Sequence, residues 1–316
     1  MIPITEVVKG IYKIGPLDTK MPTEATHPFL VVGEEQSAIV EPGEEGQIDE
    51  LLEAIRQIGV PLERIAYVIG THIHLHHVQG VPMLLPRLPQ AKFVVHPQGA
   101  PHVIEPTRLV ESTIQVWGAH CYGPFPGVPK ERVMTPADGQ VLDLGNREMQ
   151  ILYATGHAPH HMIIFDRNTR ALFSGDLVSL SPGRLRGRPD ILPPLFDVDK
   201  QIQSLRRAMA LNPYVLLRFG HQGFSFSPEK TLRWAEEDYL AVERICLDGM
   251  RRKLTSPQIG EKVEEYYRAI GVGSVQETGE PEILGRAPFG MLAYIKRKHP
   301  ELEMPAGASA RNPRTA

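Results

Sequence analysis

The chain has 316 residues, 42% of them hydrophobic, which suits one large globular domain or one domain with an appendage. Its formal net charge is -3 and no long run carries one sign, so a large basic face for nucleic acid is not indicated. The two well-separated cysteines, Cys121 and Cys246, predict neither a disulfide framework nor a cysteine-based zinc site. The N-terminal sequence lacks the basic flank and apolar run of a signal peptide, and no stretch approaches the length of a membrane span. We therefore expect a cytoplasmic protein that binds neither membrane nor nucleic acid.

Short apolar, β-branched runs dominate the first two-thirds of the chain, and each is closed by Gly, Pro or polar residues. They predict strands at residues 7–14, 29–32, 37–40, 66–69, 92–95, 149–154, 162–165, 171–173 and 214–218. Between them, residues 47–58 and 198–211 carry apolar side chains at helical spacing. Strands that are interleaved with helices and then repeated favour two mixed sheets packed face to face, with helices outside.

Residues 102–135 break this rhythm, because they contain several aromatic side chains and four prolines. Such a segment is either a functional loop or a surface insertion with buried aromatic residues, and both interpretations stay open.

Helical signals follow residue 225. Residues 227–252 and 256–270 each begin with Ser-Pro, and residues 283–298 form a third candidate helix. We predict a domain at residues 1–225, a helical region at 226–304 and a disordered tail at 305–316, which shows no apolar periodicity.

Four histidines fall within six residues, at His72, His74, His76 and His77. They follow a strand that ends at Gly70 and precede an apolar stretch, so they occupy a strand-to-helix turn. Imidazoles packed this closely would repel one another if protonated and would lack partners if buried and neutral. Imidazole is a donor suited to Zn, Fe, Ni or Cu, so the run predicts a metal site.

Three further strand ends carry a glycine followed by a metal-binding side chain, at His157, Asp176 and His221. Glycine lets the backbone turn sharply and leaves room for an ion. Each pattern alone is an ordinary turn, but the four groups in this order and spacing form a strong joint signal.

Together, these groups resemble the metallo-β-lactamase superfamily, whose hallmark is His-x-His-x-Asp-His, then a single His, an Asp and a final His. The resemblance covers residues 5–225 and implies an α/β (α+β) fold, the αββα sandwich, with the site at one edge of the sheets. It implies that Asp176 bridges two metals. It also implies ligands for the first metal at His72, His74 and His157, and for the second at His77 and His221.

The chain departs from this pattern at His76, where the family has Asp. A histidine there could still donate a nitrogen to the second metal, but it adds no negative charge. We expect a weaker second site, an altered metal preference or a single metal. The expected cofactor is one or two Zn²⁺ ions, with Fe or Mn as alternatives, and the predicted catalytic residues are His76 and Asp176.

Five more histidines are candidates for weaker roles. Beside the predicted ligand His157, one of His160 and His161 would point inward, to support the ligands or contact substrate, unless both are structural. His96, His102 and His120 lie in or near the insertion, where His120 could line a pocket.

Charged residues near the predicted site have ordinary explanations. Glu41 and Asp138 are each followed closely by glycine, so both are expected in turns, and Asp138 could also support a metal ligand. Arg184, Arg186 and Arg188 either form a solvated loop or attract an anionic substrate.

A bound metal lowers the pKa of coordinated water from about 15.7 toward 7, and the hydroxide can attack a carbonyl or phosphoryl centre. No nucleophile elbow, Walker loop or Rossmann fingerprint suggests another chemistry. We therefore predict a hydrolase that acts on a small-molecule ester, lactone, thioester or phosphoester. The alternatives are a mononuclear iron oxidoreductase acting on a thiol or persulfide, and a non-catalytic ligand-binding protein on the same scaffold. A homo-oligomer is left open.

Overall fold

The computed structural model describes residues 2–17, 26–117, 125–180, 186–189, 191, 195–220, 223–272 and 288–308. The chain divides into two compact units. The first, here called the sheet unit, comprises Met1–Tyr153, His160–Gly175 and Pro213–Phe226. The second, the helical unit, comprises Ala154–Pro159, Asp176–Asn212 and Ser227–Ala316. Among the described residues, no helix is both long and apolar enough to cross a membrane.

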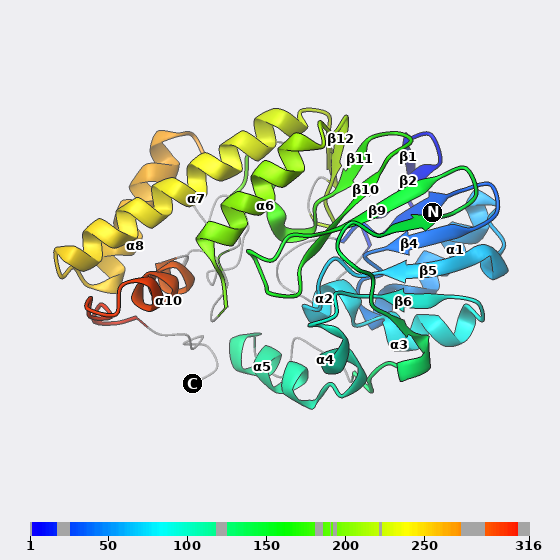
Figure 1. Ribbon diagram of the computed structural model, residues 1–316, viewed down its shortest axis with the longest axis horizontal. Helices are drawn as coiled ribbons and strands as arrows, with labels where there is room; N and C mark the ends of the chain where they lie inside the picture. The colour runs from blue at the N-terminus through cyan, green and yellow to red at the C-terminus, as the bar shows by residue number, and fades with distance from the viewer. Residues whose placement is uncertain are drawn as a thin grey trace. The chain divides into compact units, whose positions relative to one another are not determined.

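The sheet unit contains two sheets (Figure 1). The seven-stranded sheet runs in chain order through β1 (Ile4–Val8), β2 (Ile11–Ile14), β3 (Phe29–Val32), β4 (Ser37–Val40), β5 (Ile65–Ile69), β6 (Lys92–Val94) and β7 (Val133–Met134). The six-stranded sheet has the order β13 (Phe224–Ser225), β12 (Val215–Leu217), β11 (Ala171–Phe173), β10 (Met162–Asp166), β9 (Glu148–Tyr153) and β8 (Val141–Asp143). The mixed α/β class with two sheets is therefore confirmed.

One apolar core is shared by the two sheets. It joins alternate residues of the first sheet, such as Phe29 and Val31, to residues of the second, such as Phe173. The rings of Phe29 and Phe173 meet edge to face with centroids 5.5 Å apart. The intervening residues, such as Leu30, belong to a different core that includes α1 (Ile48–Ile58). Burial on both faces explains why these strands are continuous apolar runs in the sequence.

Helices of the sheet unit follow the helical spacing of the sequence. In α1, Leu51, Leu52 and Ile55 are buried, and Gly59 ends the helix in the left-handed conformation at φ 86°. Four more helices follow: α2 (Leu75–Val78), α3 (Val81–Leu84), α4 (Ala100–Ile104) and α5 (Thr107–Trp117). The last two differ from the irregular segment expected at residues 102–135. In α5, Leu109 is buried and Val110 is partly buried against the same core as α1, so tertiary packing supports a helix that the flanking prolines obscured.

The first predicted strand, residues 7–14, is instead a hairpin of β1 and β2. Gly10 turns the chain with φ 72°, a conformation that glycine adopts without strain. Added at Gly10, a Cβ atom would also lie 2.9 Å from a guanidinium nitrogen of Arg147, so the turn is packed against this arginine.

Arg147 is buried and links parts of both sheets. Its guanidinium donates to the carbonyl oxygens of Gly10 (2.8 Å) and Val32 (3.1 Å) and lies 3.5 Å from the buried carboxylate of Asp166 in β10. Arg147→Met should destabilise the protein by about 3–5 kcal/mol, because it leaves the Asp166 charge buried without its cationic partner, although the hydrogen bonds from Thr169 are kept. Denaturant unfolding measures this loss. Exposed Arg167→Met is the matched control, and a loss below about 1 kcal/mol for Arg147→Met would contradict the role assigned to the buried pair.

The helical unit contains α6 (Val198–Ala210), α7 (Pro228–Arg251), α8 (Ser256–Ala269) and α10 (Pro288–Lys298) (Figure 1). Helix α7 packs against the other three. Helices α7 and α8 lie where the Ser-Pro signals predicted them, and Thr255 caps α8 reciprocally with Gln258. Of the third candidate helix, residues 283–287 lie outside the described residues. In the expected tail, the carbonyl of Ala306 accepts from the Ser256 amide at 2.9 Å, and residues 309–316 lie outside the described part of the chain.

Candidate metal centre

The candidate centre begins at the carboxyl ends of three neighbouring parallel strands. Val40 of β4 pairs with Ile69 of β5, which pairs with Val94 of β6, so the segments that follow these strands leave from one edge of the sheet. At Gly70 a Cβ atom would lie 2.7 Å from a methyl carbon of Val78, so glycine permits the close turn from β5 into α2. This turn and α2 carry the four histidines.

The four histidine rings lie close together. The ring centroid of His72 is 4.4 Å from that of His74 and 4.1 Å from that of His77, and the rings of His76 and His77 are 4.2 Å apart. Nε2 of His72 lies 2.9 Å from Nδ1 of His74. The two nitrogens are therefore close enough for both to bind one ion.

Glu41, directly after β4, contacts two parts of this group. Its Oε2 lies 2.8 Å from Nδ1 of His77, and its Oε1 accepts a hydrogen bond from the hydroxyl of Thr71. Thr71 Oγ1 in turn lies 3.0 Å from Nδ1 of His72. A carboxylate at Nδ1 holds the proton there and directs the lone pair of Nε2 toward a metal. Potential ligand atoms of Glu41, His72 and His77 all lie within 4.8 Å of one another.

The sequence interpretation of Glu41 as a turn residue was incomplete. Its φ of 59° is the left-handed conformation of a turn, but its side chain is buried against the histidines. A signal was present in the sequence, because Glu41 directly follows the strand that precedes the histidine strand. Parallel pairing of those strands places Glu41 beside the histidine turn.

The second histidine pair also belongs to the sheet unit. His161 is fully buried, with its ring 5.2 Å from that of His72. The ring of His160 lies 6.4 Å from His72 and 6.1 Å from His74. A Cβ atom at Gly175 would come within 2.5 Å of both His161 Nε2 and Thr71 Oγ1, so only glycine fits there. These contacts place both histidines beside the first group.

His157 and Asp176 belong to the helical unit. Both are buried, and His157 Nε2 lies 3.6 Å from Asp176 Oδ2. The residue before His157 must be small, since a Cβ atom at Gly156 would lie 2.3 Å from the Cα atom of Gln201 in α6. The structure thus brings together one pair of predicted ligands in this unit. The remaining predicted ligand, His221, lies outside the described residues.

The expectation of a solvated arginine loop was wrong for Arg186 and Arg188. Arg186 donates through Nε (2.8 Å) and Nη2 (2.5 Å) to the two carboxylate oxygens of Asp238, and Arg188 forms a similar two-bond pair with Glu264. The Arg188 guanidinium also lies 4.6 Å from the ring centroid of Tyr267. Both charges are neutralised within the helical unit, so they give no support to an anion-attracting loop. Arg184 lies outside the described residues.

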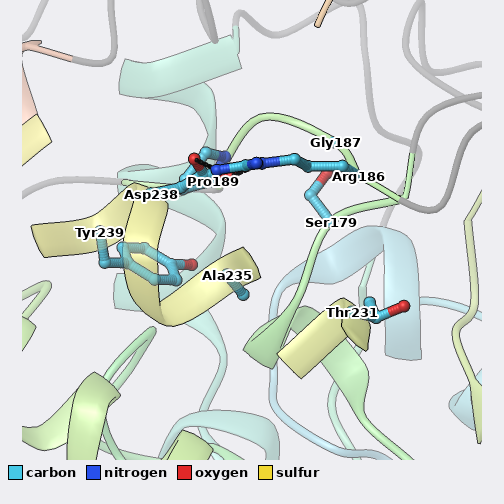
Figure 2. Close-up of a pocket in the computed structure, with 8 residues that line it drawn as sticks. All are labelled: Ser179, Arg186, Gly187, Pro189, Thr231, Ala235, Asp238 and Tyr239. Atoms are coloured by element: carbon cyan, nitrogen blue, oxygen red, sulfur yellow. Dashed lines mark hydrogen bonds and ion pairs between the residues drawn. The ribbon is translucent and has the colours of Figure 1, made fainter. Parts of the chain in front are cut away.

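Figure 2 shows a small pocket beside the pair of Arg186 and Asp238, also lined by Ser179, Thr231 and Tyr239. Its interior has room for about one water molecule. The pocket is therefore too small for the substrates considered above, and it marks the packing of the loop against α7.

The other candidates are spread over the sheet unit. Asp138 accepts from the Tyr153 amide at 2.9 Å, as expected for a turn residue, and His102 lies in α4. His96, just after β6, is buried with its ring 4.1 Å from that of Tyr153. His120 lies outside the described residues.

The potential ligand atoms are of the types that bind a transition metal such as zinc. Convergent imidazole nitrogens at His72 and His74, with a carboxylate behind His77, match the ligand types and outer hydrogen bonds of zinc sites in proteins. Within the helical unit, His157 and Asp176 bring together a nitrogen and a carboxylate, which are also ligand types of zinc.

Comparison with known proteins identifies relatives with this fold. The chain is 27% identical over 224 residues to the metallo-beta-lactamase fold-containing protein ST1585 of Sulfurisphaera tokodaii, covering 68% of this chain and 79% of that protein. The crystal structure of ST1585 superposes with a TM-score of 0.62, at 25% identity, over 74% of this chain and 87% of that one.

Two curated enzymes are also similar. Hydroxyacylglutathione hydrolase GloC of Haemophilus influenzae is 24% identical over 209 residues, 61% of this chain and 82% of that protein. The atrochrysone carboxyl ACP thioesterase of Aspergillus fumigatus is 25% identical over 160 residues, 51% of this chain and 38% of that protein. The sequence model of the metallo-beta-lactamase superfamily matches residues 22–221, which is more than half of the chain. The chain therefore belongs to the metallo-beta-lactamase superfamily.

Proposed function

We propose that this protein is a metal-dependent hydrolase of thioesters or related small esters. The observation that carries the proposal is the hydrogen-bonded series Glu41, His77, Thr71 and His72. A buried carboxylate costs free energy to maintain in a protein core. Binding of an ion by the imidazoles whose tautomers it fixes would explain why the protein keeps it.

The ligand assignment follows the order of the superfamily motif. We assign the first metal to His72, His74 and His157, and a bridging position to Asp176. A second ion would take His77 and His221, with His76 as an additional nitrogen donor. Superfamily membership supports this assignment, as do the convergence of His72 with His74 and the proximity of His157 to Asp176.

When bound, such a metal supplies Lewis acidity and activates water for attack on a carbonyl group. The residues around the histidines fix the tautomers and orientations of the imidazoles that would bind the ion. Glu41 keeps the proton of His77 on Nδ1, and Thr71 places a hydroxyl beside Nδ1 of His72. Partial burial of the histidine turn limits the access of bulk water, which strengthens polar interactions with the substrate.

Thioesters are favoured over the lactones and phosphoesters that the same chemistry would allow. Two relatives, GloC and the Aspergillus enzyme, are named for thioester hydrolysis.

Elemental analysis of the purified protein, followed by assays on the metal-loaded form, tests this function. We expect at least one zinc per chain and faster hydrolysis of hydroxyacylglutathione than of a matched oxygen ester. Iron content with oxygen uptake on a thiol or persulfide would overturn the proposal in favour of an oxidoreductase. Ligand binding without turnover in metal-loaded protein would instead indicate a sensor.

His76→Asp should raise the affinity for a second metal ion by about tenfold, equivalent to about 1.4 kcal/mol. The substitution restores a negative charge at the position where the superfamily motif has one. A carboxylate attracts a metal cation more strongly than a neutral imidazole does. Calorimetric zinc titration of both proteins measures the change. His102→Asp adds the same charge outside the histidine group and should leave both affinities unchanged. Equal second-site affinity in His76→Asp and the parent would refute the charge argument.

A further inference from the structure

His96 lies at the same sheet edge as the histidine turn. Val94 of β6 pairs with Ile69 of β5, so His96 stands two residues beyond β6 as Thr71 stands two residues beyond the paired position in β5. The turn after His96 also contacts the histidine turn, because a Cβ atom at Gly99 would lie 2.9 Å from Cγ2 of Ile73. His96 is not one of the proposed metal ligands.

The hydrogen bonds of His96 define its tautomer. Its Nδ1 accepts the backbone N–H of Gln98 at 3.1 Å, so Nδ1 carries a lone pair and the proton of the neutral ring is on Nε2. Burial lowers the pKa of His96, with a smaller opposing effect from Asp138, which favours the neutral form near neutral pH. His96 therefore presents Nε2–H as a donor in a fixed orientation, with its ring against Tyr153.

This donor lacks an acceptor. His96 is 3% exposed, and Nε2 has no hydrogen-bond partner among the residues that the structure describes. An unsatisfied buried donor costs about 1–3 kcal/mol, and native proteins retain few of them, so each one needs an explanation. Tyr153, whose ring packs against that of His96, is only partly buried. Its hydroxyl donates a hydrogen bond to the carbonyl oxygen of Pro136 at 2.7 Å.

We propose that the Nε2–H group of His96 donates a hydrogen bond to a carbonyl or carboxylate oxygen of the substrate and so acts as a specificity residue. This inference rests on the proposed hydrolase function, which supplies an acyl substrate and a carboxylate product at this edge. In surroundings shielded from water, one correctly placed acceptor discriminates strongly between ligands that carry an oxygen there and ligands that do not.

Nuclear magnetic resonance of the zinc-loaded protein, labelled with ¹⁵N in histidine, tests the inference directly. We expect His96 as the Nε2–H tautomer, with its Nε2 proton shifting downfield as lactate is added. Propane-1,2-diol, which replaces the carboxylate of lactate by an alcohol, should leave that signal in place. A lactate titration that leaves the His96 signal unmoved would overturn the inference, whatever happens at the other histidines.

Two variants add a quantitative measure. His96→Gln keeps an amide donor near the position of Nε2, whereas His96→Phe keeps a ring against Tyr153 and removes the donor. We expect lactate affinity to fall about tenfold in His96→Phe and by less than about threefold in His96→Gln. Equal losses in both variants would overturn the inference. If His96→Phe does not fold, the signal of the parent protein decides alone.

The same data separate this inference from the proposed function. If lactate shifts the His96 proton but the metal-loaded protein hydrolyses no acyl substrate, the hydrolase proposal fails and the donor role stands. If hydrolysis occurs while the His96 proton is unmoved by lactate, the hydrolase proposal stands and the donor role fails.

Discussion

His72→Ala and His157→Ala should each remove most of the bound metal and reduce hydrolysis by more than about 100-fold. Loss of even an outer hydrogen-bonding partner of a ligand commonly costs 10–100-fold in metal affinity or activity, so loss of a ligand itself should cost about that much or more. Equal losses in both variants would support the proposed ligand assignment, which follows the order of the superfamily motif. Metal content by elemental analysis and initial rates with excess zinc measure the two effects.

The controls for this experiment separate ligation from loss of a histidine in general. His299→Ala removes an imidazole that pairs with Glu301 and lies far along the chain from the motif. This variant should keep its full metal content. The metal content and hydrolysis rate of Glu41→Gln should lie between those of the ligand variants and those of His299→Ala. This substitution weakens the orientation of His77 but leaves every proposed ligand in place. Full metal content in both His72→Ala and His157→Ala would reject the ligand assignment.

Residue type and spacing in the sequence suffice to predict the main members of the candidate centre. Four histidines in one turn have few alternative explanations, and the glycines before the other candidates are explained by close packing at Gly156 and Gly175. The role of Glu41 is hidden in the sequence, because a single carboxylate followed by Pro-Gly is typical of a turn. It becomes visible only when parallel pairing places its strand beside that of His72.

Long-range ion pairs set a different limit on sequence prediction. Three arginines close together in the sequence suggested a solvated or anion-binding segment. The partners of Arg186 and Arg188 lie 52 and 76 residues away, on α7 and α8. No periodicity or local motif joins residues at such separations. The same reason hid the role of Arg147, which contacts a turn 137 residues earlier. Local patterns predicted most helices and strands, whereas contacts between distant elements required the fold.

A protein that ends at Phe226 should fail to fold as a soluble, cooperative unit. The truncation removes α7, α8 and α10, and α7 packs directly on α6. Helix α6 would expose Ile202, Leu205 and Ala208, and burial of each large apolar side chain contributes about 1.5–3 kcal/mol. The hydrogen bond from Gln201 to the Tyr239 hydroxyl would also be lost. Soluble yield and a thermal unfolding transition measured by circular dichroism provide the test.

Point substitutions in full-length protein distinguish a stabilising role for the helices from simple truncation damage. Asp238→Ala removes the buried carboxylate that pairs with Arg186 and accepts the Tyr266 hydroxyl at 2.7 Å, so it should lower the free energy of unfolding by about 3 kcal/mol. Deleting only residues 309–316, which contain no large apolar side chain, should leave stability unchanged. The cut is placed after Ala308 because Pro305 is buried and Ala306 accepts from Ser256.

A soluble protein ending at Phe226 with full metal content and hydrolysis would show that α7, α8 and α10 are dispensable for the centre. A normal stability for Asp238→Ala would show that the arginine pairs do not hold the loop that begins at Asp176.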